Sequence, residues 1–559
     1  MNILNINKMK IYKHISAFAL AALAMLSLAS CDDYLDTLPD DRAEIDTEEK
    51  ARQLMVSAYP TSATVLLNEM TSDNIGDNGR SYSSSVLVEQ LYKFEDVTEE
   101  GGNDSPYSIW GGLYQAVATV NEAMQAIDKM EMTENLHAIK AEGQMIRAYC
   151  MFQLAQTFCM GWNPEKADEY LGLPYPLEPE QDINTKYTRG TLRQLYEAIN
   201  KDIEEALPYI SDAIYKIKKY HFNRAAAYAF AAKFNLCYMN YEKAIQYATQ
   251  VLGSDPTTVM RNYEPYRSLG RTDFANRWIR SEEDCNLLLI STYSSASRQL
   301  ALGLSSRYNH NQAMASYETY WVDMPWGSGS SDNTIIYANK LYGSNQCVYY
   351  PSADEQFEYT DKVAGIGYVH MVYPVCTGDQ TILDRAEAYA LMGNYQAAVN
   401  DINTWILTHC AETSGPTVRP VMTIESINEW IENIDYAPRQ PDGNRDRTMR
   451  KIFHPQGFTV SAGTQENLLQ FILHMRRIET VAYGTRLTDI KRYGIEFTHF
   501  VAGSDPVIFI QGDLRGAIQI PQTVITAGLE PNPRMDPDAL KKYIEDTTPK
   551  PEEGEGEEE

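Results

Sequence analysis

The chain has 559 residues and a formal net charge of −28, because 76 acidic side chains outnumber 48 basic ones. A field of this sign and size repels nucleic acid and anionic lipid headgroups, so the composition excludes both as partners. Seven of the eight cysteines follow residue 31, and their spacings match no zinc or Cys-x-x-Cys pattern. The composition therefore gives no reason to expect disulfide or redox chemistry.

Residues 1–30 have the layout of a secretory signal peptide. Lys8, Lys10 and Lys13 precede an apolar run from Ile15 to Leu28, with small residues at its end. The run is too short for a membrane-spanning helix, which needs about 20 apolar residues. We therefore predict that residues 1–30 are removed from the mature protein.

The end of this signal matches a bacterial lipoprotein signal. Leu28–Cys31 supplies a leucine, two small residues and a cysteine. We predict acyl chains, palmitate among them, on Cys31, and several such chains anchor a protein stably at a bilayer surface. The alternative is an ordinary secretory signal followed by a chance cysteine. The acidic stretch Asp32–Asp36 is either a solvated linker or a sorting signal for display on an outer surface.

Between residues 108 and 253 apolar side chains recur at the spacing of one helix face, in segment after segment. The last of these stripes stops at Pro208, which cannot continue a helix. The apolar stripes consist of Trp110, Leu113, Tyr114, Val117, Val120 and Met124; Met145, Ala148, Tyr149, Phe152, Leu154 and Ala155; and Leu192, Leu195, Tyr196, Ile199, Ile203 and Leu207. We expect Cys150 and Cys237, within such runs, to be buried as small hydrophobic residues.

An internal similarity indicates the architecture. One alanine-tyrosine-alanine set repeats the spacings of 9 and 3 residues of another, and Gly393 marks the turn in the second copy. Small residues at these positions let two antiparallel helices approach closely, as in tetratricopeptide helix-turn-helix units. The two sets are Ala232, Tyr241, Ala244 and Ala386, Tyr395, Ala398. They lie 154 residues apart, so we predict repeats that meet in space across intervening sequence.

The segment from about 254 to 380 reads as a long insertion in this helical scaffold. It contains a short buried strand at 287–293 and turn-rich aromatic stretches at 317–321 and 325–329. Long irregular insertions on a rigid scaffold are common places for ligand binding. We therefore predict a mostly α protein with minor β structure, whose insertion helps to form a ligand-binding face.

Tyrosine outnumbers phenylalanine by 38 to 15, an imbalance that suits wet surfaces. Aromatic rings stack on the C–H faces of sugars, and tyrosine hydroxyls offer hydrogen bonds. The competing interpretation of each candidate is ordinary packing of loop aromatics and Asx-turn caps. The ligand-binding candidates are Asp73, Asn74, Arg80, Tyr82, Trp278, Tyr320, Trp321 and Trp326.

Catalytic and metal motifs are absent from the sequence. It contains no HExxH, GxSxG or P-loop, and its nine histidines are scattered. The acidic segment 73–79 could bind Ca²⁺, but Ile75 occupies a ligand position of the EF-hand pattern, so we favour a turn and predict no metal or cofactor. A pair of carboxylates with glycosidase geometry stays open, because the separation of two carboxylates cannot be read from sequence.

The charged residues of the late segment 476–489 are dense enough to suggest a functional site. Arg476, Glu479, Arg486 and Asp489 occur within 14 positions. We interpret them instead as an ion-pair network that packs helices together.

The order of several motifs resembles the SusD/RagB family, the surface lipoproteins of Bacteroidetes nutrient-uptake systems. The resemblance spans residues 31 to about 536. It rests on Cys31–Asp36, Ser72–Asn74, Trp110-x-x-Leu113-Tyr114 with Asn121, Glu142 with Arg147–Tyr149 and Gly161, Arg476–Glu479, Gly484–Gly494, Ile520–Pro521 and Asn532–Pro533.

This resemblance implies a scaffold of four tetratricopeptide-like helix pairs with a loop-rich ligand face. It also implies a lipid-anchored protein on the outside of the outer membrane, which acts as a lid on a SusC-like TonB-dependent transporter. Such a lid captures an oligosaccharide, or in some members a peptide, and breaks no bond. The alternatives are a glycan-cleaving surface lipoprotein and a tetratricopeptide-type adaptor that binds only envelope proteins.

The predicted organisation is therefore a lipoprotein signal peptide at 1–30, a single SusD-like domain at 31–536 and an acidic, disordered tail at 537–559.

Overall fold

The computed structural model of the chain describes residues 45–548, apart from 181, 183–184, 302–305, 345–346 and 444–445. Its contacts divide the chain between Asp46 and Thr47, and the helices and strands of the described residues belong to the unit that begins at Thr47. The predicted signal peptide, the lipid-attachment residue Cys31 and residues 549–559 lie outside the described residues.

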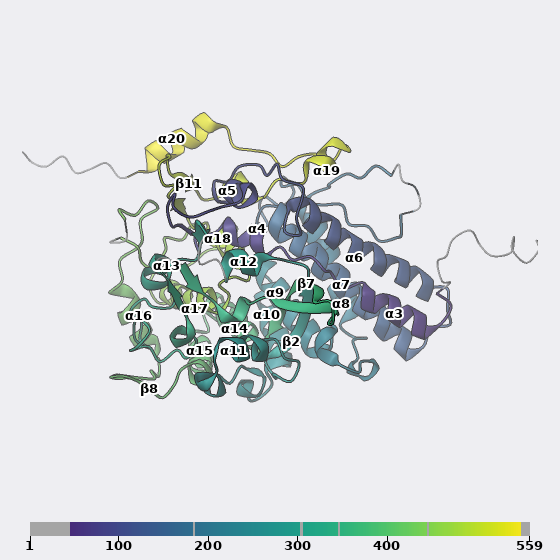
Figure 1. Cartoon of the computed structure of the whole chain (residues 1–559), viewed down its shortest axis with the longest axis horizontal. Coiled ribbons are helices and arrows are strands. Elements are labelled where there is room, and N and C mark those ends of the chain that lie inside the picture. The colour runs from purple at the N-terminus through teal and green to yellow at the C-terminus, as the bar shows by residue number, and fades with distance from the viewer. Residues whose placement is uncertain are drawn as a thin grey trace, which may run out of the picture. The chain divides into compact units, whose positions relative to one another are not determined.

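The first part of this unit is a stack of helices, as the apolar stripes predict. α7 contacts both α6 and α8, and α3 packs against α6 and α7 (Figure 1). The apolar side chains of the stripes are buried, apart from the half-buried Tyr114. The helices are α3 (Glu48–Ser57), α4 (Val65–Met70), α5 (Val86–Tyr92), α6 (Pro106–Ile127), α7 (Glu134–Phe158) and α8 (Leu192–Ala206).

Side chains at the start of each long helix explain where these helices begin. The Ser105 hydroxyl accepts a hydrogen bond from the main-chain N–H of Ser108, and Pro106 takes the first helical position of α6. Thr191 and Gln194 form a capping box at the start of α8. α8 ends two residues before Pro208, as predicted.

The two predicted repeat units are helix hairpins. α9 (Arg224–Cys237) and α10 (Tyr241–Leu252) form the first, and α14 (Gly378–Leu391) and α15 (Tyr395–His409) form the second. The four repeat alanines are buried. The turn residue Gly393 has a φ of +77°, a conformation that favours glycine. The hairpins meet through α10 and α14, where Ala244 and Ala388 pack with Leu236, so the repeats assemble in space as predicted.

The insertion supplies a three-stranded antiparallel sheet. Its strand order is β2–β7–β6, and β2 (Asn286–Thr292) packs against α9 of the first helix hairpin. The predicted strand at 287–293 is thus confirmed. The other elements of the insertion are η3 (Pro256–Val259), η4 (Glu264–Ser268), α11 (Arg271–Trp278), α12 (Ala296–Leu300), β3 (Tyr308–Asn309), α13 (Gln312–Tyr317), η5 (Tyr337–Lys340), β4 (Tyr342–Ser344), β5 (Cys347–Tyr349), η6 (Pro351–Ala353), β6 (Gln356–Asp361) and β7 (Ile366–Thr377).

The last part of the chain returns through the middle of the molecule. α17 contacts α14, α15 and α16, and α18 contacts α4 (Figure 1). The elements outside the insertion that remain are β1 (Gly76–Asp77), η1 (Asp212–Ile214), η2 (Lys218–Tyr220), β8 (Thr413–Ser414), β9 (Thr417–Val418), α16 (Ile424–Glu432), α17 (Thr464–Glu479), α18 (Arg486–Tyr493), β10 (Phe497–His499), β11 (Val507–Phe509), η7 (Leu514–Gly516), α19 (Gln522–Thr526) and α20 (Pro537–Thr547).

A buried ion-pair network joins α14, α17 and α18. The Arg476 guanidinium donates to Glu387 and lies 3.0 Å from Asp384 and 3.3 Å from Asp489. Arg492 lies 2.8 Å from Glu387. Although burial alone raises the pKa of Glu387, Arg476 and Arg492 hold it below its ordinary value. The prediction of a packing network among the late charged residues is therefore confirmed for Arg476 and Asp489.

The seven cysteines from Cys150 to Cys410 are free and buried, as predicted for Cys150 and Cys237. Within the described ranges, no helix combines the length and the apolar character needed to cross a membrane.

The prediction of disorder from residue 537 onward is wrong for its first part. Pro537–Thr547 forms α20, which begins with Asp536 as its cap and Pro537 in the first turn. The Tyr543 hydroxyl donates to Glu496 at 2.8 Å and fixes the helix to the rest of the unit. The acidic composition concealed these local helix signals.

Arg476→Ala should lower the free energy of unfolding by about 3–5 kcal/mol, because it leaves three buried carboxylates without this partner. Urea unfolding followed by circular dichroism measures the loss. Arg298→Ala, which breaks an exposed pair with Glu355, is the matched control and should cost less than about 1 kcal/mol. Equal losses for the two variants would contradict the role of the network.

Candidate functional site

The first group of predicted site residues lies inside the protein. Asp73 and Asn74 are buried. Arg486 donates two hydrogen bonds to the Asp73 carboxylate, at 2.7 and 2.8 Å, and Arg477 donates to the side chain of Asn74 at 2.7 Å. The prediction that Asp73 and Asn74 face a ligand is wrong, because arginines some 400 residues later in the chain occupy their oxygen atoms.

Three of the predicted aromatic residues also belong to the interior. Tyr320 and Trp326 are buried, and the Trp326 ring packs against Trp405 and Phe471. Trp278 is buried, with the guanidinium carbon of Arg261 3.7 Å from its ring centroid. The insertion folds back onto α15 and α17, so its large rings complete the core. The prediction of Trp278, Tyr320 and Trp326 as ligand contacts is corrected accordingly.

The other three predicted residues keep some solvent access. Arg80 is exposed, but its guanidinium donates to the carbonyls of Ala502 and Gly503 at 2.9 and 2.8 Å. Tyr82 is half-buried. Trp321 is half-buried, and its indole N–H donates to the carbonyl of Ala338 at 3.1 Å. Ligand binding by these residues stays a prediction.

The segment 73–79 contains β1 and an Asx turn, and arginine side chains face its two carboxylates. Asp77 accepts a hydrogen bond from the main-chain N–H of Gly79 at 2.7 Å, which forms an Asx turn. Its carboxylate also pairs with Arg307 at 2.9 Å, as Asp73 pairs with Arg486. This arrangement supports the turn over calcium binding.

The most exposed aromatic side chains of the insertion lie on the hairpin of β6 and β7. The first half of β7 pairs only with β6, beyond the end of β2, so solvent reaches both faces of this hairpin. A turn at 362–365 closes it, where Asp361 accepts from the main-chain N–H groups of Val363 and Ala364. Side chains on both faces of this part of the hairpin are therefore accessible to solvent, because no core covers either face.

Aromatic rings occur on both faces of this hairpin. On one face Phe357 and Tyr359, 47% and 52% exposed, pack edge-on with ring centroids 4.8 Å apart. On the other face Tyr368 packs edge-on against Tyr293, which is 47% exposed, with centroids 5.3 Å apart. The Tyr368 hydroxyl donates to Glu358 at 2.7 Å, and this hydrogen bond raises the pKa of Tyr368 to about 12. We name Tyr293, Phe357, Glu358, Tyr359 and Tyr368 the hairpin surface.

The backbone beneath Tyr293 is firmly held. Its N–H donates to the carbonyl of Thr61 at 2.8 Å, and the Asn103 side chain donates to its carbonyl at 2.7 Å. The next residue, Ser294, donates to the Asp104 carboxylate at 2.5 Å. The loop before α6 thus fixes the end of β2, and Tyr293 has a rigid support.

Sequence analysis missed every residue of the hairpin surface. A signal was present, because polar and aromatic residues alternate along 356–360, directly before a turn segment, which is the pattern of an exposed strand in a hairpin. Tryptophan-rich stretches of the insertion attracted the prediction instead, and their size is what places them in the core.

Apart from the hairpin surface, a groove of about 550 Å³ beside α6 is large enough to hold a ligand. Side chains from residues 174–180 and 185–188, and from α19 and the segment directly after it, form its other walls. Among its lining aromatics, Trp110 is buried and the Tyr114 hydroxyl already donates to the carbonyl of Pro174 at 2.9 Å. Tyr187 is 41% exposed and faces solvent more freely.

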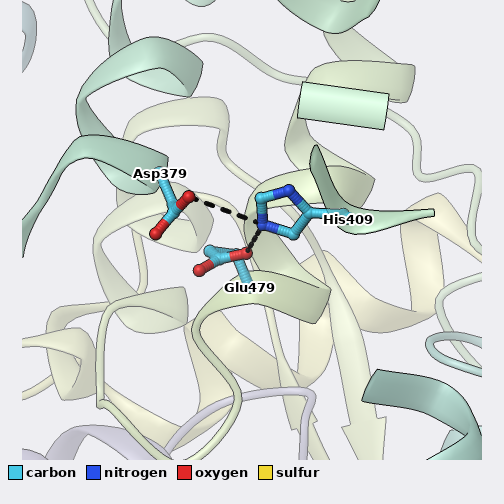
Figure 2. A group of neighbouring side chains, drawn as sticks. All are labelled: Asp379, His409 and Glu479. Carbon is cyan, nitrogen blue, oxygen red and sulfur yellow. Dashed lines mark hydrogen bonds and ion pairs between the residues drawn. The ribbon is translucent and has the colours of Figure 1, made fainter. Parts of the chain in front are cut away.

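A buried group of three side chains could hold a metal ion. Figure 2 shows the Asp379 and Glu479 carboxylates and the His409 imidazole pointing toward one another. His409 Nε2 lies 3.0 Å from Glu479 Oε2 and 3.7 Å from Asp379 Oδ1. Separations of 30 and 70 residues in the sequence hid this group from motif analysis.

The chain is similar to a group of proteins from outer-membrane systems. Residues 33–236 match a SusD-like family model described as starch-binding and associating with the outer membrane. A SusD-like protein of Formosa agariphila is 20% identical over 517 residues, which cover 87% of this chain and 92% of that protein.

Solved structures share the fold. A SusD superfamily protein of Bacteroides thetaiotaomicron has a TM-score of 0.57 and 18% identity, and the match covers 87% of this chain and 100% of that one. A SusD-like carbohydrate binding protein of Bacteroides vulgatus has a TM-score of 0.55 and 14% identity, with coverage of 86% and 97%. The mostly α fold with minor sheets is therefore established.

Acid should weaken the fold through Glu318, which lies 2.8 Å from Arg447 and Lys451 and 3.1 Å from Arg477. Although burial alone raises its pKa, Lys451, Arg477 and Arg447 lower the pKa of Glu318 to about 2. The unfolded state, with the ordinary pKa of 4.5, binds the proton first, so stability should fall as the pH drops from about 4.5 to 2.

Urea unfolding at a series of pH values measures this dependence. Glu318→Gln should show a shallower slope over that range, whereas the exposed control Glu131→Gln should keep the wild-type slope. Identical slopes in all three proteins would contradict the assignment.

Proposed function

Because the chain belongs to the SusD/RagB family, we propose that it is a surface lipoprotein that captures an oligosaccharide for import. Cys31 carries the lipid anchor in the outer membrane, and the protein faces outward. It acts as a lid that delivers its ligand to a SusC-like TonB-dependent transporter. The family description, starch-binding and associating with the outer membrane, supports this proposal.

The observation that carries the binding proposal is the hairpin surface. Tyr293, Phe357 and Tyr359 are 47%, 47% and 52% exposed, and Tyr368 is half-buried beside Tyr293. The Tyr293–Tyr368 face offers two tyrosine rings at an interplanar angle of 64°, with the Glu358 carboxylate beside them. Rings that stack on sugar C–H groups next to a hydrogen-bond acceptor are the chemistry that an oligosaccharide needs.

We propose binding without bond cleavage. Glycoside hydrolysis needs two carboxyl groups about 5–10 Å apart on either side of the sugar bond. On the hairpin, Glu358 is the carboxylate beside the Tyr293–Tyr368 face, and it accepts a hydrogen bond from Tyr368. Release of reducing sugar from a bound glycan would overturn this part of the proposal and favour a glycan-cleaving lipoprotein.

The double variant Tyr293→Ala/Tyr368→Ala should weaken glycan binding at least 10-fold, because each stacked ring that is lost removes about 1 kcal/mol or more. Affinity electrophoresis in gels that contain soluble starch or one of a panel of other polysaccharides identifies the ligand, and calorimetry with its oligosaccharides measures the loss.

One single variant serves as a control, and two others test alternative binding sites. Tyr220→Ala removes an exposed tyrosine of the helical scaffold and should bind as the wild type does. Tyr359→Ala tests the opposite face of the hairpin, and Tyr187→Ala tests the groove beside α6. Loss of binding in Tyr187→Ala with unchanged binding in the double variant would contradict the proposal. Binding of peptides or envelope proteins alone, with no polysaccharide, would favour the adaptor alternative.

Cys31→Ala should release the protein from the outer membrane, because the acyl chains would have no attachment point. Membrane fractionation and labelling of cells with radioactive palmitate measure anchoring and acylation. Cys150→Ala, which changes a buried cysteine, is the control and should stay membrane-bound and labelled. A Cys31→Ala protein that remains labelled in the membrane fraction would contradict the anchor.

A further inference from the structure

Three chain elements converge on the buried side chains of Asp379, His409 and Glu479 (Figure 2). Asp379 lies in the first turn of α14, His409 is the last residue of α15, and Glu479 is the last residue of α17. Their side chains are 1%, 2% and 4% exposed. The group therefore joins the second helix hairpin to the helix that carries the buried arginines.

The surroundings of His409 indicate which of its ring nitrogens bears the proton. Nδ1 lies 2.9 Å from the main-chain carbonyl of Trp405, an atom that can only accept a hydrogen bond. The Thr408 hydroxyl lies 2.9 Å from the same nitrogen, and it donates to helix carbonyls, so its oxygen also serves as an acceptor. Nδ1 therefore carries a proton, and Nε2 is the ring nitrogen that faces the two carboxylates.

Two buried carboxylates thus meet at Nε2, and the positive charge that they need comes either from a second proton on the ring or from a bound cation. Nε2 lies 3.0 Å from Glu479 Oε2 and 3.7 Å from Asp379 Oδ1. Asp379 Oδ2 is buried and has no hydrogen-bond partner within the described part of the chain. A buried group of this composition requires a positive charge among its atoms.

Arginine and lysine do not supply that charge as they do elsewhere in the core. In the described ranges, Asp379 and Glu479 form ion pairs with His409 alone, unlike Asp73 and Glu387, which pair with arginine. The main-chain N–H of Arg261 donates to Asp379 at 2.9 Å.

The guanidinium of Arg261 makes its hydrogen bonds to other groups, and its buried Nε has no hydrogen-bond partner in the described part of the chain. It donates to Tyr266 at 2.7 Å and to Asn286 at 2.8 Å, and it lies 3.9 Å from Glu283. Two carboxylates are thus left for a cation to neutralise. Burial, together with the Glu479 carboxylate, raises the pKa of Asp379 to about 6, although His409 and Arg261 oppose the rise.

We propose that Asp379, His409 and Glu479 bind one divalent transition-metal ion, with Zn²⁺ the best chemical match. An imidazole nitrogen with two carboxylate oxygens is a ligand set that zinc accepts, whereas calcium and magnesium prefer oxygen ligands alone. The three ligand atoms lie within 4.8 Å of one another, so small side-chain rotations bring them to metal–ligand distances of about 2.0–2.2 Å.

The groups that contact His409 and Glu479 from outside the site fit the same assignment. Metal-bound histidines commonly donate their other N–H to a main-chain carbonyl, as His409 does to Trp405. The Trp405 indole N–H donates to Glu479 Oε2 at 3.3 Å and orients that carboxylate. Because the group is buried among α14, α15 and α17, the ion would hold these three helices together. It binds the folded state and stabilises it by mass action.

The test compares the full chain refolded from denaturant with EDTA, with and without added Zn²⁺. Metal content by mass spectrometry should be about one zinc per chain, and zinc should raise the melting temperature. Glu479→Gln, of equal size, should retain at least 10-fold less zinc and lose the zinc-dependent rise. His474→Gln changes another buried histidine of α17 and should keep both.

A second measurement keeps the test decisive if Glu479→Gln does not refold. Co²⁺ added to the metal-free wild type should give visible absorption bands that added Zn²⁺ abolishes. A wild type with no retained zinc, no cobalt bands and a melting temperature that zinc does not change would overturn the proposal. In that case a second proton on the His409 ring supplies the positive charge.

Discussion

The rest of the structure depends on a set of buried arginines near the C-terminus. Arg476 and Arg492 bind carboxylates of α14, while Arg477 and Arg486 bind the loop after α4. Taking charged groups out of water is costly unless each has a well-placed partner, so the loss of one arginine should destabilise the fold by leaving its carboxylates unpaired. They join the second repeat hairpin, the C-terminal helices and the first loop into one frame, although hundreds of residues separate them in the sequence.

That frame explains why ligand-binding groups are found where they are. The insertion buries Trp326 against α15 and α17, and its sheet attaches to the helices through β2. The outer half of the β6–β7 hairpin extends past β2, and its aromatic rings stay in contact with water. Rings held on a strand lose little conformational freedom when they bind, which favours affinity for a weakly interacting ligand such as a sugar.

Local and periodic features of the fold could be predicted from the sequence, whereas side-chain placement in the insertion could not. The sequence predicted the helix hairpins from alanines such as Ala232 and Ala386, and it predicted a helix end from Pro208. These residues act on nearby parts of the chain, so their effect could be predicted from local spacing. Asp73 looked like an exposed turn residue, because its partner Arg486 is 413 positions away. Trp326 looked like a ligand platform, because sequence alone does not distinguish an exposed tryptophan from one that fills the core.

The most direct test of the account is a crystal structure of the protein with the oligosaccharide that it binds most tightly. The account predicts sugar rings stacked on Tyr293 and Tyr368, with a hydroxyl within hydrogen-bond distance of Glu358, and no change in the buried arginine contacts. A sugar in the groove beside α6, with the hairpin rings uncovered, would contradict it.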